Sequence, residues 1–352
     1  MSSSTGLQLG DASYLLEDAE VSCLFAPMAE RAAILAFERA LSKAQHSVGE
    51  IDAEALAAIV AACQDPQLDE EALAAGMRRD GVIVPELVRQ MRAAIGPLHG
   101  ARFHLGATSQ DAVDTALMIR MKRVIAILQT RLSALLVQLE TLIRAQGALP
   151  AMARTRYQDA LPFTIGDRVR TWVAPLQGLA DTAPDHFPLQ LGGPIGLREA
   201  AYGRNNKAIA EAMAADLQLS FASEAWHTDR RAIGAVASWC LDLATVLGKV
   251  GQDVAIMAQT PVGEIRAPGG GSSAMPHKSN PVGAERLVTL ARYVAGNAAM
   301  LQTAALHENE RSGIAWSLEW LALPPVLIGC GSALLTAQEL IEGLEPGHRG
   351  PG

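Results

Sequence analysis

The chain of 352 residues is poor in aromatic side chains: Phe, Trp and Tyr make up 4% of it, whereas hydrophobic residues as a class make up 49%. An interior short of aromatics is built mainly from Ala, Leu, Val and Ile, a mixture that favours packed helices over a β-sandwich. No strand-like alternation or internal repeat stands out, although short strands beside 162–165 and 187–191 stay open. We therefore predict an all-α fold.

Positive charge is scarce as well. Lys and Arg number 29 against 37 Asp and Glu, for a formal net charge of −8. The chain as a whole lacks the basic footprint of a nucleic-acid-binding protein, so we expect no nucleic-acid partner. The apolar content, in turn, exceeds what one compact monomer is expected to hide, which indicates faces buried between subunits.

The sequence has only four cysteines, at Cys23, Cys63, Cys240 and Cys330. They form no Cys-x-x-Cys pair and have no histidine at metal-ligand spacing, which excludes a disulfide framework and a zinc knuckle. We predict reduced core thiols and no metal.

The first twenty residues reach acidic side chains early and lack the basic-then-apolar order of a signal peptide, so we expect none. This favours a cytoplasmic protein. The longest uncharged stretch, 321–338, is interrupted by Pro324, Pro325 and two glycines. We expect a buried helix that starts at the prolines and no membrane-spanning segment.

What the chain does contain is long helical periodicity. Apolar residues alternate at spacings of 3 and 4 along 118–142 and 233–257, and more weakly along 287–304 after an expected N-cap at Asn280. Such regularity predicts long, packed helices, with the three stripes buried between subunits.

Shorter helical patterns precede these stripes, and Pro66 and Gly81 separate them. We predict an N-terminal helical domain at 1–100. A central long-helix domain follows at 101–344, and a short tail at 345–352.

Three polar islands interrupt the apolar background. In the first, at 104–116, Gly106 supplies a turn, and Thr108, Ser109 and Gln110 stand just before a long helix. Amides at a helix N-terminus attract anions, so this island is a candidate carboxylate site. The alternative is that its hydroxyls and Asp111 only cap the helix.

The second island, at 153–164, offers Arg154, Thr155, Arg156 and Gln158, and by itself it is indistinguishable from a solvated loop. The third, at 267–285, has three successive glycines followed by hydroxyl, amide and cationic side chains: Ser272, Ser273, His277, Lys278 and Asn280. It has the composition of a mobile loop that holds an anion, or of a flexible surface linker.

The distance between the first and second islands decides whether they can line one site. The helix between the first and second spans about 30 residues, or roughly 45 Å, so these islands cannot line one site within a single subunit. If they converge, they do so across chains, which favours a symmetric tetramer.

The third island resembles the signature G-S-S-x-M-P-x-K-x-N-P of the fumarase/aspartase superfamily, in the run GSSAMPHKSNP at 271–281. The runs GATSQD at 106–111 and RTRYQ at 154–158 are similar to its other two motif regions, in the expected order. The resemblance implies a long-helix homotetramer with active sites shared by three subunits. It also implies a di- or tricarboxylate substrate and chemistry through an aci-carboxylate carbanion, with no cofactor.

The same resemblance implies individual roles. Ser272 exchanges the proton next to the carboxylate, a role that requires strong stabilisation of its alkoxide. Lys278 and Asn280 hold the developing charge. The remaining candidates for contact with substrate are Thr108, Ser109, Gln110, Thr155, Arg156, Gln158, His104, His277 and Arg311.

Within the superfamily, the runs at 106–116, 191–196, 226–228 and 307–320 are most similar to cycloisomerases that convert 3-carboxy-cis,cis-muconate to carboxymuconolactone in the protocatechuate branch of aromatic degradation. Arg156 stands where many of the lyases have a histidine. A leaving carboxylate, with an ordinary pKa near 4, needs no acid to depart, so this replacement favours cycloisomerisation, with Arg156 binding a substrate carboxylate.

Two alternatives remain. One is a C–N lyase similar to adenylosuccinate lyase that releases fumarate, and the other is a catalytically silent structural helical oligomer. The superfamily usually carries a further C-terminal helical domain of roughly a hundred residues, which we expect to be shortened or missing here.

Overall fold

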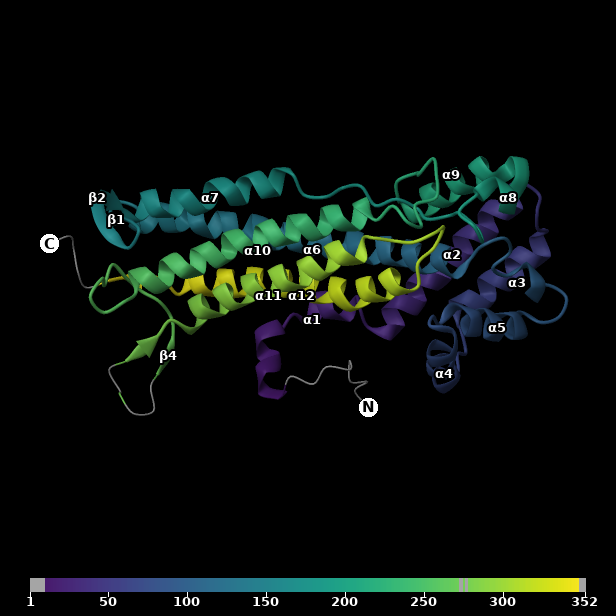
Figure 1. The fold of residues 1–352 in the computed structure, drawn as a ribbon, viewed down its shortest axis with the longest axis horizontal. Helices are drawn as coiled ribbons and strands as arrows, with labels where there is room; N and C mark the ends of the chain where they lie inside the picture. Colours follow the sequence, from purple (N-terminus) through teal and green to yellow (C-terminus); the bar gives the residue numbers. More distant parts are fainter. Residues whose placement is uncertain (1–9, 272–274, 276–277, 348–352) are drawn as a thin grey trace.

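The computed structural model describes residues 10–271, 275 and 278–347. Figure 1 shows an elongated bundle of long helices with a group of shorter helices at one end. The described part is predominantly helical, and its strands form three two-stranded ribbons, so the predicted all-α scaffold is confirmed.

The long helices of the bundle, α6, α7, α10, α11 and α12, lie side by side (Figure 1). Helix α12 packs against α6, α10 and α11, and α7 packs against α6 and α10. The apolar stripes of these helices are buried, as the periodicity predicts for long packed helices. The helices are α6 (Ser109–Gln146), α7 (Ile165–Asp181), α10 (Arg231–Met257), α11 (Val282–Ala304) and α12 (Ile314–Glu342).

The stripes face one another inside a single chain, so the prediction that they are buried between subunits is wrong. Leu128, Leu132, Leu243, Leu247 and Leu287 are each 0% exposed with no second chain present. The apolar side chains left exposed come from other positions, among them Val137, Leu161, Leu306, Ile314 and Leu321.

The shorter helices build a second core at one end of the bundle. It draws on α2 to α5 and also on Leu189, Leu191, Ile209 and Met213, so the unit predicted for 1–100 shares its core with later residues. The helices are α1 (Ala19–Cys23), α2 (Pro27–Ser47), α3 (Ala53–Gln64), α4 (Glu70–Asp80), α5 (Val84–Ile95), α8 (Arg198–Tyr202) and α9 (Asn206–Leu217), with 3-10 turns at Gly10–Leu16, Gly100–Arg102 and Gly203–Asn205.

Local signals explain several helix ends. Asp52 accepts a hydrogen bond from the Ala55 amide at 2.7 Å and caps α3. Asp69 caps α4 in the same way, and Gly81, at φ 70°, ends that helix in the left-handed conformation. Helix α11 starts one residue later than Asn280 predicts: its N-cap is Pro281, because Asn280 belongs to a strand.

The strands are short and lie at the loops. β1 (Pro150–Thr155) pairs with β2 (Gln158–Thr164), and β3 (Ile265–Arg266) pairs with β6 (Glu345–Pro346). β4 (Gly270–Gly271) pairs with β5 (Ser279–Asn280). The pairing of β6 ties the first residues of the predicted tail to the loop after α10.

Helix α12 contradicts the prediction of a helix that starts at the prolines, because it begins at Ile314 and continues through Pro324 and Pro325. Each proline removes a backbone donor, but the neighbouring Leu323 and Val326 are 1% and 0% exposed. Packing on the bundle therefore outweighs the local cost.

By length and composition alone, α6, α10 and α12 qualify as membrane-spanning helices, although 39%, 56% and 67% of their apolar windows are buried inside the protein. The cysteine prediction holds for Cys63, Cys240 and Cys330, which are free and buried. It is wrong for Cys23, which is exposed on the short helix α1.

Candidate active site

Helix α6 separates the polar islands. Its 38 residues span about 57 Å at 1.5 Å per residue. Thr108 precedes its first residue, and the β1–β2 hairpin follows its last turn, at the opposite end of the bundle (Figure 1). The β4–β5 ribbon lies at the hairpin's end. We call these the Thr108 end and the hairpin end.

At the Thr108 end, an arginine from a distant part of the chain meets the start of α6. Arg311, from the segment between α11 and α12, donates a hydrogen bond through Nη1 to Oγ1 of Thr108. Ser109, the first residue of α6, is partly exposed beside it. A guanidinium, two hydroxyls and a helix N-terminus together form a suitable site for a carboxylate.

A buried carboxylate fixes this helix start. Asp111 accepts hydrogen bonds from the amides of Thr108 (3.0 Å), Gly192 (2.7 Å) and Gly193 (2.9 Å). Its Oδ1 also lies 2.9 Å from Nε2 of His227. Three of the runs that carry the family resemblance therefore converge on one side chain, which holds Thr108 in place.

Gln110 points into the protein and is 1% exposed. Its amide nitrogen donates to Oδ2 of Asp114 at 3.1 Å and to the carbonyl of His227 at 2.8 Å. These contacts are structural, and the predicted contact of Gln110 with substrate stays a prediction.

Close to the Thr108 end, a buried ionic network joins α6, the start of α10 and α12. Arg230 binds both oxygens of Asp114 (2.7 and 3.0 Å) and both of Glu319 (2.9 and 2.6 Å), and Trp316 donates to Asp114 at 2.9 Å. Burial opposes ionisation of Asp114, but Arg230 outweighs it and lowers the pKa of that carboxyl. Burial raises the pKa of Glu319, because Arg230 offsets the loss of water only in part.

Sequence reasoning missed the pairing of Asp114, Arg230 and Glu319. The available signal is that ionisable residues interrupt long apolar helices, where an unpaired charge is unfavourable.

His104 has a partner in the N-terminal core. Its Nδ1 lies 2.6 Å from Oε1 of Glu38, whose side chain is 0% exposed. Burial disfavours the charged ring, but Glu38 outweighs it and raises the pKa of His104 above 6.5. The contact with Glu38 gives His104 a structural role, and its contact with substrate stays a prediction.

At the hairpin end, the second island is a two-residue turn. Thr155 and Gln158 are register partners, and Arg156 and Tyr157 between them have φ of 51° and 65°. Such a turn requires positive φ at both central residues. Thr155, Arg156 and Gln158 are exposed together at the tip.

The hairpin is tied to the loop that leads to the third island. Arg154 forms ion pairs of 2.9 Å with Glu264 and with Asp159, and the Met152 amide donates to Glu264 at 2.9 Å. Glu264 directly precedes β3. The second and third islands therefore lie at the same end of one chain.

The β4–β5 ribbon pairs Gly270 and Gly271 with Asn280 and Ser279 and so joins the two sides of the third island. The amide of Lys278 donates to the carbonyl of Met275 at 2.9 Å, and its side chain is exposed. Asn280 lies in β5, partly buried. Ser272 and His277 lie outside the described residues. Within the described residues, no group of three or more His, Cys, Asp or Glu is arranged to hold a metal ion.

A family model described as Lyase matches residues 15–296. The chain belongs to the fumarase/aspartase superfamily. The geometry of the two ends shows where this lyase carries the family's motifs: one at the Thr108 end and two at the hairpin end.

The chain is 35% identical over 349 residues to a 3-carboxy-cis,cis-muconate cycloisomerase of Pseudomonas aeruginosa, covering 96% of this chain and 75% of the relative. It is 36% identical over 330 residues to a nitrosuccinate lyase of Streptomyces davaonensis, covering 89% and 70%. A crystal structure of a 3-carboxy-cis,cis-muconate lactonizing enzyme from Pseudomonas putida matches with a TM-score of 0.88 at 33% identity, covering 95% and 77%.

Proposed function

We propose that this lyase is a cycloisomerase that converts 3-carboxy-cis,cis-muconate to carboxymuconolactone. The strongest support is that three 3-carboxy-cis,cis-muconate cycloisomerases match it at 35%, 37% and 35% identity over 96%, 89% and 92% of the chain. Arg156, exposed at the hairpin tip, supplies a cation for a tricarboxylate substrate rather than a proton for a leaving group.

The reaction forms one carbon–oxygen bond and adds one proton to a carbon of the substrate. A carboxylate of the substrate attacks a carbon of the conjugated diene, and the electron pair moves toward the carbon next to another carboxylate, which becomes an aci-carboxylate. Lys278 and Asn280 stabilise the charge on its oxygens, and Ser272 delivers the proton that completes the lactone. Thr108, Ser109 and Arg311 bind a carboxylate away from the reacting bond, as do Thr155, Arg156 and Gln158.

Because the two ends lie about 57 Å apart along α6, their residues meet only where different chains bring opposite ends together. We propose a homotetramer whose active sites combine the Thr108 end of one subunit with the hairpin ends of others. We also propose that the protein is cytoplasmic.

The test is to mix the purified protein with carboxymuconate and to follow the ultraviolet absorbance of its conjugated diene. We expect the absorbance to fall as the lactone forms. Adenylosuccinate and nitrosuccinate are assayed in parallel, for release of fumarate and of nitrite. Release of either from an enzyme that leaves the diene intact contradicts the proposal, and inactivity on all three favours the silent oligomer.

A further inference from the structure

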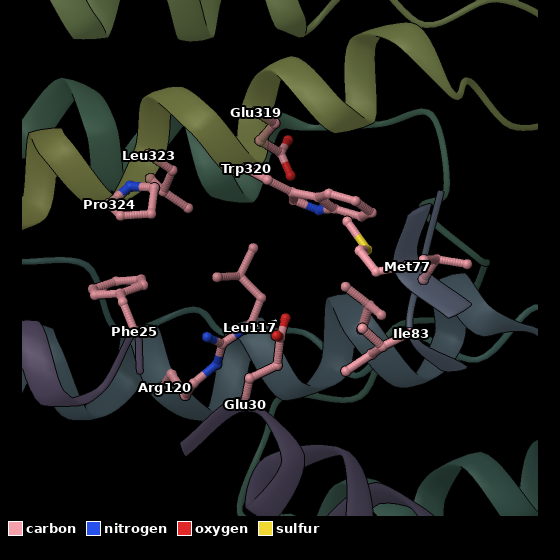
Figure 2. Close-up of a pocket in the computed structure, with 12 residues that line it drawn as sticks. Phe25, Glu30, Met77, Ile83, Leu117, Arg120, Glu319, Trp320, Leu323 and Pro324 are labelled. Carbon is pink, nitrogen blue, oxygen red and sulfur yellow. Dashed lines mark ion pairs between the residues drawn. The ribbon is translucent and has the colours of Figure 1, made fainter. Parts of the chain in front are cut away.

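A cavity of about 250 Å³ lies near the Thr108 end, between α12, α6 and the N-terminal helices, with Glu319 of the buried ionic network in its wall. Figure 2 shows Trp320, Leu323 and Pro324 entering it from α12, opposite Leu117 and Arg120 of α6. Most of its wall is apolar. Dry apolar cavities of about 150 Å³ take up benzene, so this one has room for a ring with a substituent.

One charged side chain at the cavity, Arg120, has few hydrogen-bond partners, and its guanidinium lies 5.8 Å from the centre of the Phe25 ring. Arg120 is 7% exposed; its Nε donates to the carbonyl of Ala116 at 3.1 Å, and its Nη1 lies 3.5 Å from the carbonyl of Leu24. Its Nη2 lies 3.6 Å from Glu30, longer than a hydrogen bond. A guanidinium has five N–H groups, and most of those of Arg120 have no acceptor among the described residues.

Two further observations agree with an anion at this place. Burial lowers the pKa of Arg120, and Glu30, 33% exposed in its side chain, offsets this only in part. The indole N–H of Trp320, in the cavity wall, has no acceptor among the described residues, although buried Trp side chains usually find one. The other carboxylate at the wall, Glu319, is already bound on both oxygens by Arg230.

We propose that this cavity is a binding site for a small aromatic monocarboxylate. The carboxylate binds the free N–H groups of Arg120 in place of the distant Glu30, and the ring lies among Leu117, Leu323 and Trp320. Met77 at the rim is 38% exposed, which gives the ligand a way in. The site is separate from the proposed catalytic residues and does not depend on the proposed reaction.

Benzoate is the probe, and isothermal titration calorimetry on the full chain is the measurement. We expect saturable binding that Arg120→Met weakens at least tenfold, since one charge-assisted contact is lost. Arg123→Met, which removes an exposed arginine from the same helix, leaves the affinity unchanged. Benzamide, the neutral analogue of the same shape, binds at least tenfold more weakly than benzoate.

Glu30→Gln is expected to strengthen benzoate binding, the opposite of the effect of Arg120→Met. Removing the competing carboxylate leaves Arg120 fully available, so benzoate binds several-fold more tightly than to the wild type. Ile83→Trp fills the cavity from the rim and abolishes binding without removing a charge. Carboxymuconate turnover in Arg120→Met stays at the wild-type level.

Arg311→Met separates this cavity from the catalytic carboxylate site, because benzoate still binds this variant with wild-type affinity. The proposal is overturned if no saturable binding occurs at millimolar benzoate. It is equally overturned if Arg120→Met and Ile83→Trp bind as the wild type does, or if Arg311→Met alone removes the binding.

Discussion

Arg311 and Thr108 form the contact on which the proposed carboxylate site at the Thr108 end depends. Arg311→Met removes a charge-assisted interaction with substrate, so we expect kcat/KM for carboxymuconate to fall by roughly 100-fold. The free energy of unfolding changes little, because the Arg311 side chain is exposed. Arg292→Met, at another exposed arginine, is the matched control and keeps wild-type kinetics. Equal kcat/KM in the two variants contradicts the assignment.

Ser272 and Lys278 carry the chemical step in the proposed reaction. Ser272→Ala removes the proton donor and Lys278→Met removes the cation that stabilises the aci-carboxylate, so each lowers kcat by at least roughly 100-fold. Size-exclusion chromatography checks that both variants keep the wild-type oligomer. Substantial turnover by Ser272→Ala refutes the proton-transfer role.

His104 makes stability depend on pH. Because its folded-state pKa is raised above the ordinary 6.5, protonated His104 stabilises the fold fully below that value, and this contribution is lost as pH rises through the folded-state pKa. His104→Asn keeps a side chain that tolerates its φ of 59° but removes the charge. We expect the variant's loss in free energy of unfolding to be largest at about pH 5 and to shrink by about pH 9.

Urea unfolding across that range measures the effect, with His186→Asn, at an exposed histidine, as the control. A loss that is the same at both ends of the range contradicts the ionic role of His104.

At the residue scale, sequence patterns named candidate residues for the site but not their contacts within the chain. The motif runs pointed to Thr108 and Arg311 as carboxylate ligands, and the structure brings the two together. The network of Asp114, Arg230 and Glu319 joins residues 116 and 89 positions apart, and no local spacing encodes such a pairing. The one available signal is that Asp114 and Glu319 lie within long apolar helices, where a buried charge needs a partner.

At the scale of elements, the β1–β2 turn is built from unfavourable residues. Arg156 and Tyr157 both have positive φ, which costs an ordinary residue about 1–2 kcal/mol. Tyr157→Gly relieves this at an exposed side chain, so we expect it to raise the free energy of unfolding by up to about 1 kcal/mol with kcat/KM unchanged.

We expect Arg156→Gly to stabilise the turn similarly but to lower kcat/KM, because it removes the cation proposed to bind substrate. Urea unfolding and steady-state kinetics on the two variants separate the effects. Full activity of Arg156→Gly contradicts its substrate-binding role.

Helix existence was predictable from periodicity, whereas helix ends and partners were not. The alternating stripes located α6, α10 and α11, because a sustained apolar face must be buried somewhere. They did not say against what, and the structure pairs them within one chain. Local rules placed a helix start at the prolines of α12, but tertiary packing carries the helix through both.

At the scale of the whole molecule, the length of α6 places the proposed carboxylate-binding groups at opposite ends of the helix bundle. The long apolar stripes are buried within one chain, so they do not form an intersubunit face. The case for shared sites is therefore geometric: Arg311 and Lys278 serve the same substrate only if neighbouring subunits run in opposite directions.

Co-expression of Lys278→Met and Arg311→Met chains tests this most directly. Each variant alone is expected to have almost no turnover of carboxymuconate. In hybrid oligomers, an unaltered Arg311 end meets an unaltered Lys278 end at roughly a quarter of the sites if the chains mix at random. We therefore predict recovery of about a quarter of the wild-type activity in purified hybrids. Hybrids as inactive as their parents would contradict active sites shared between subunits.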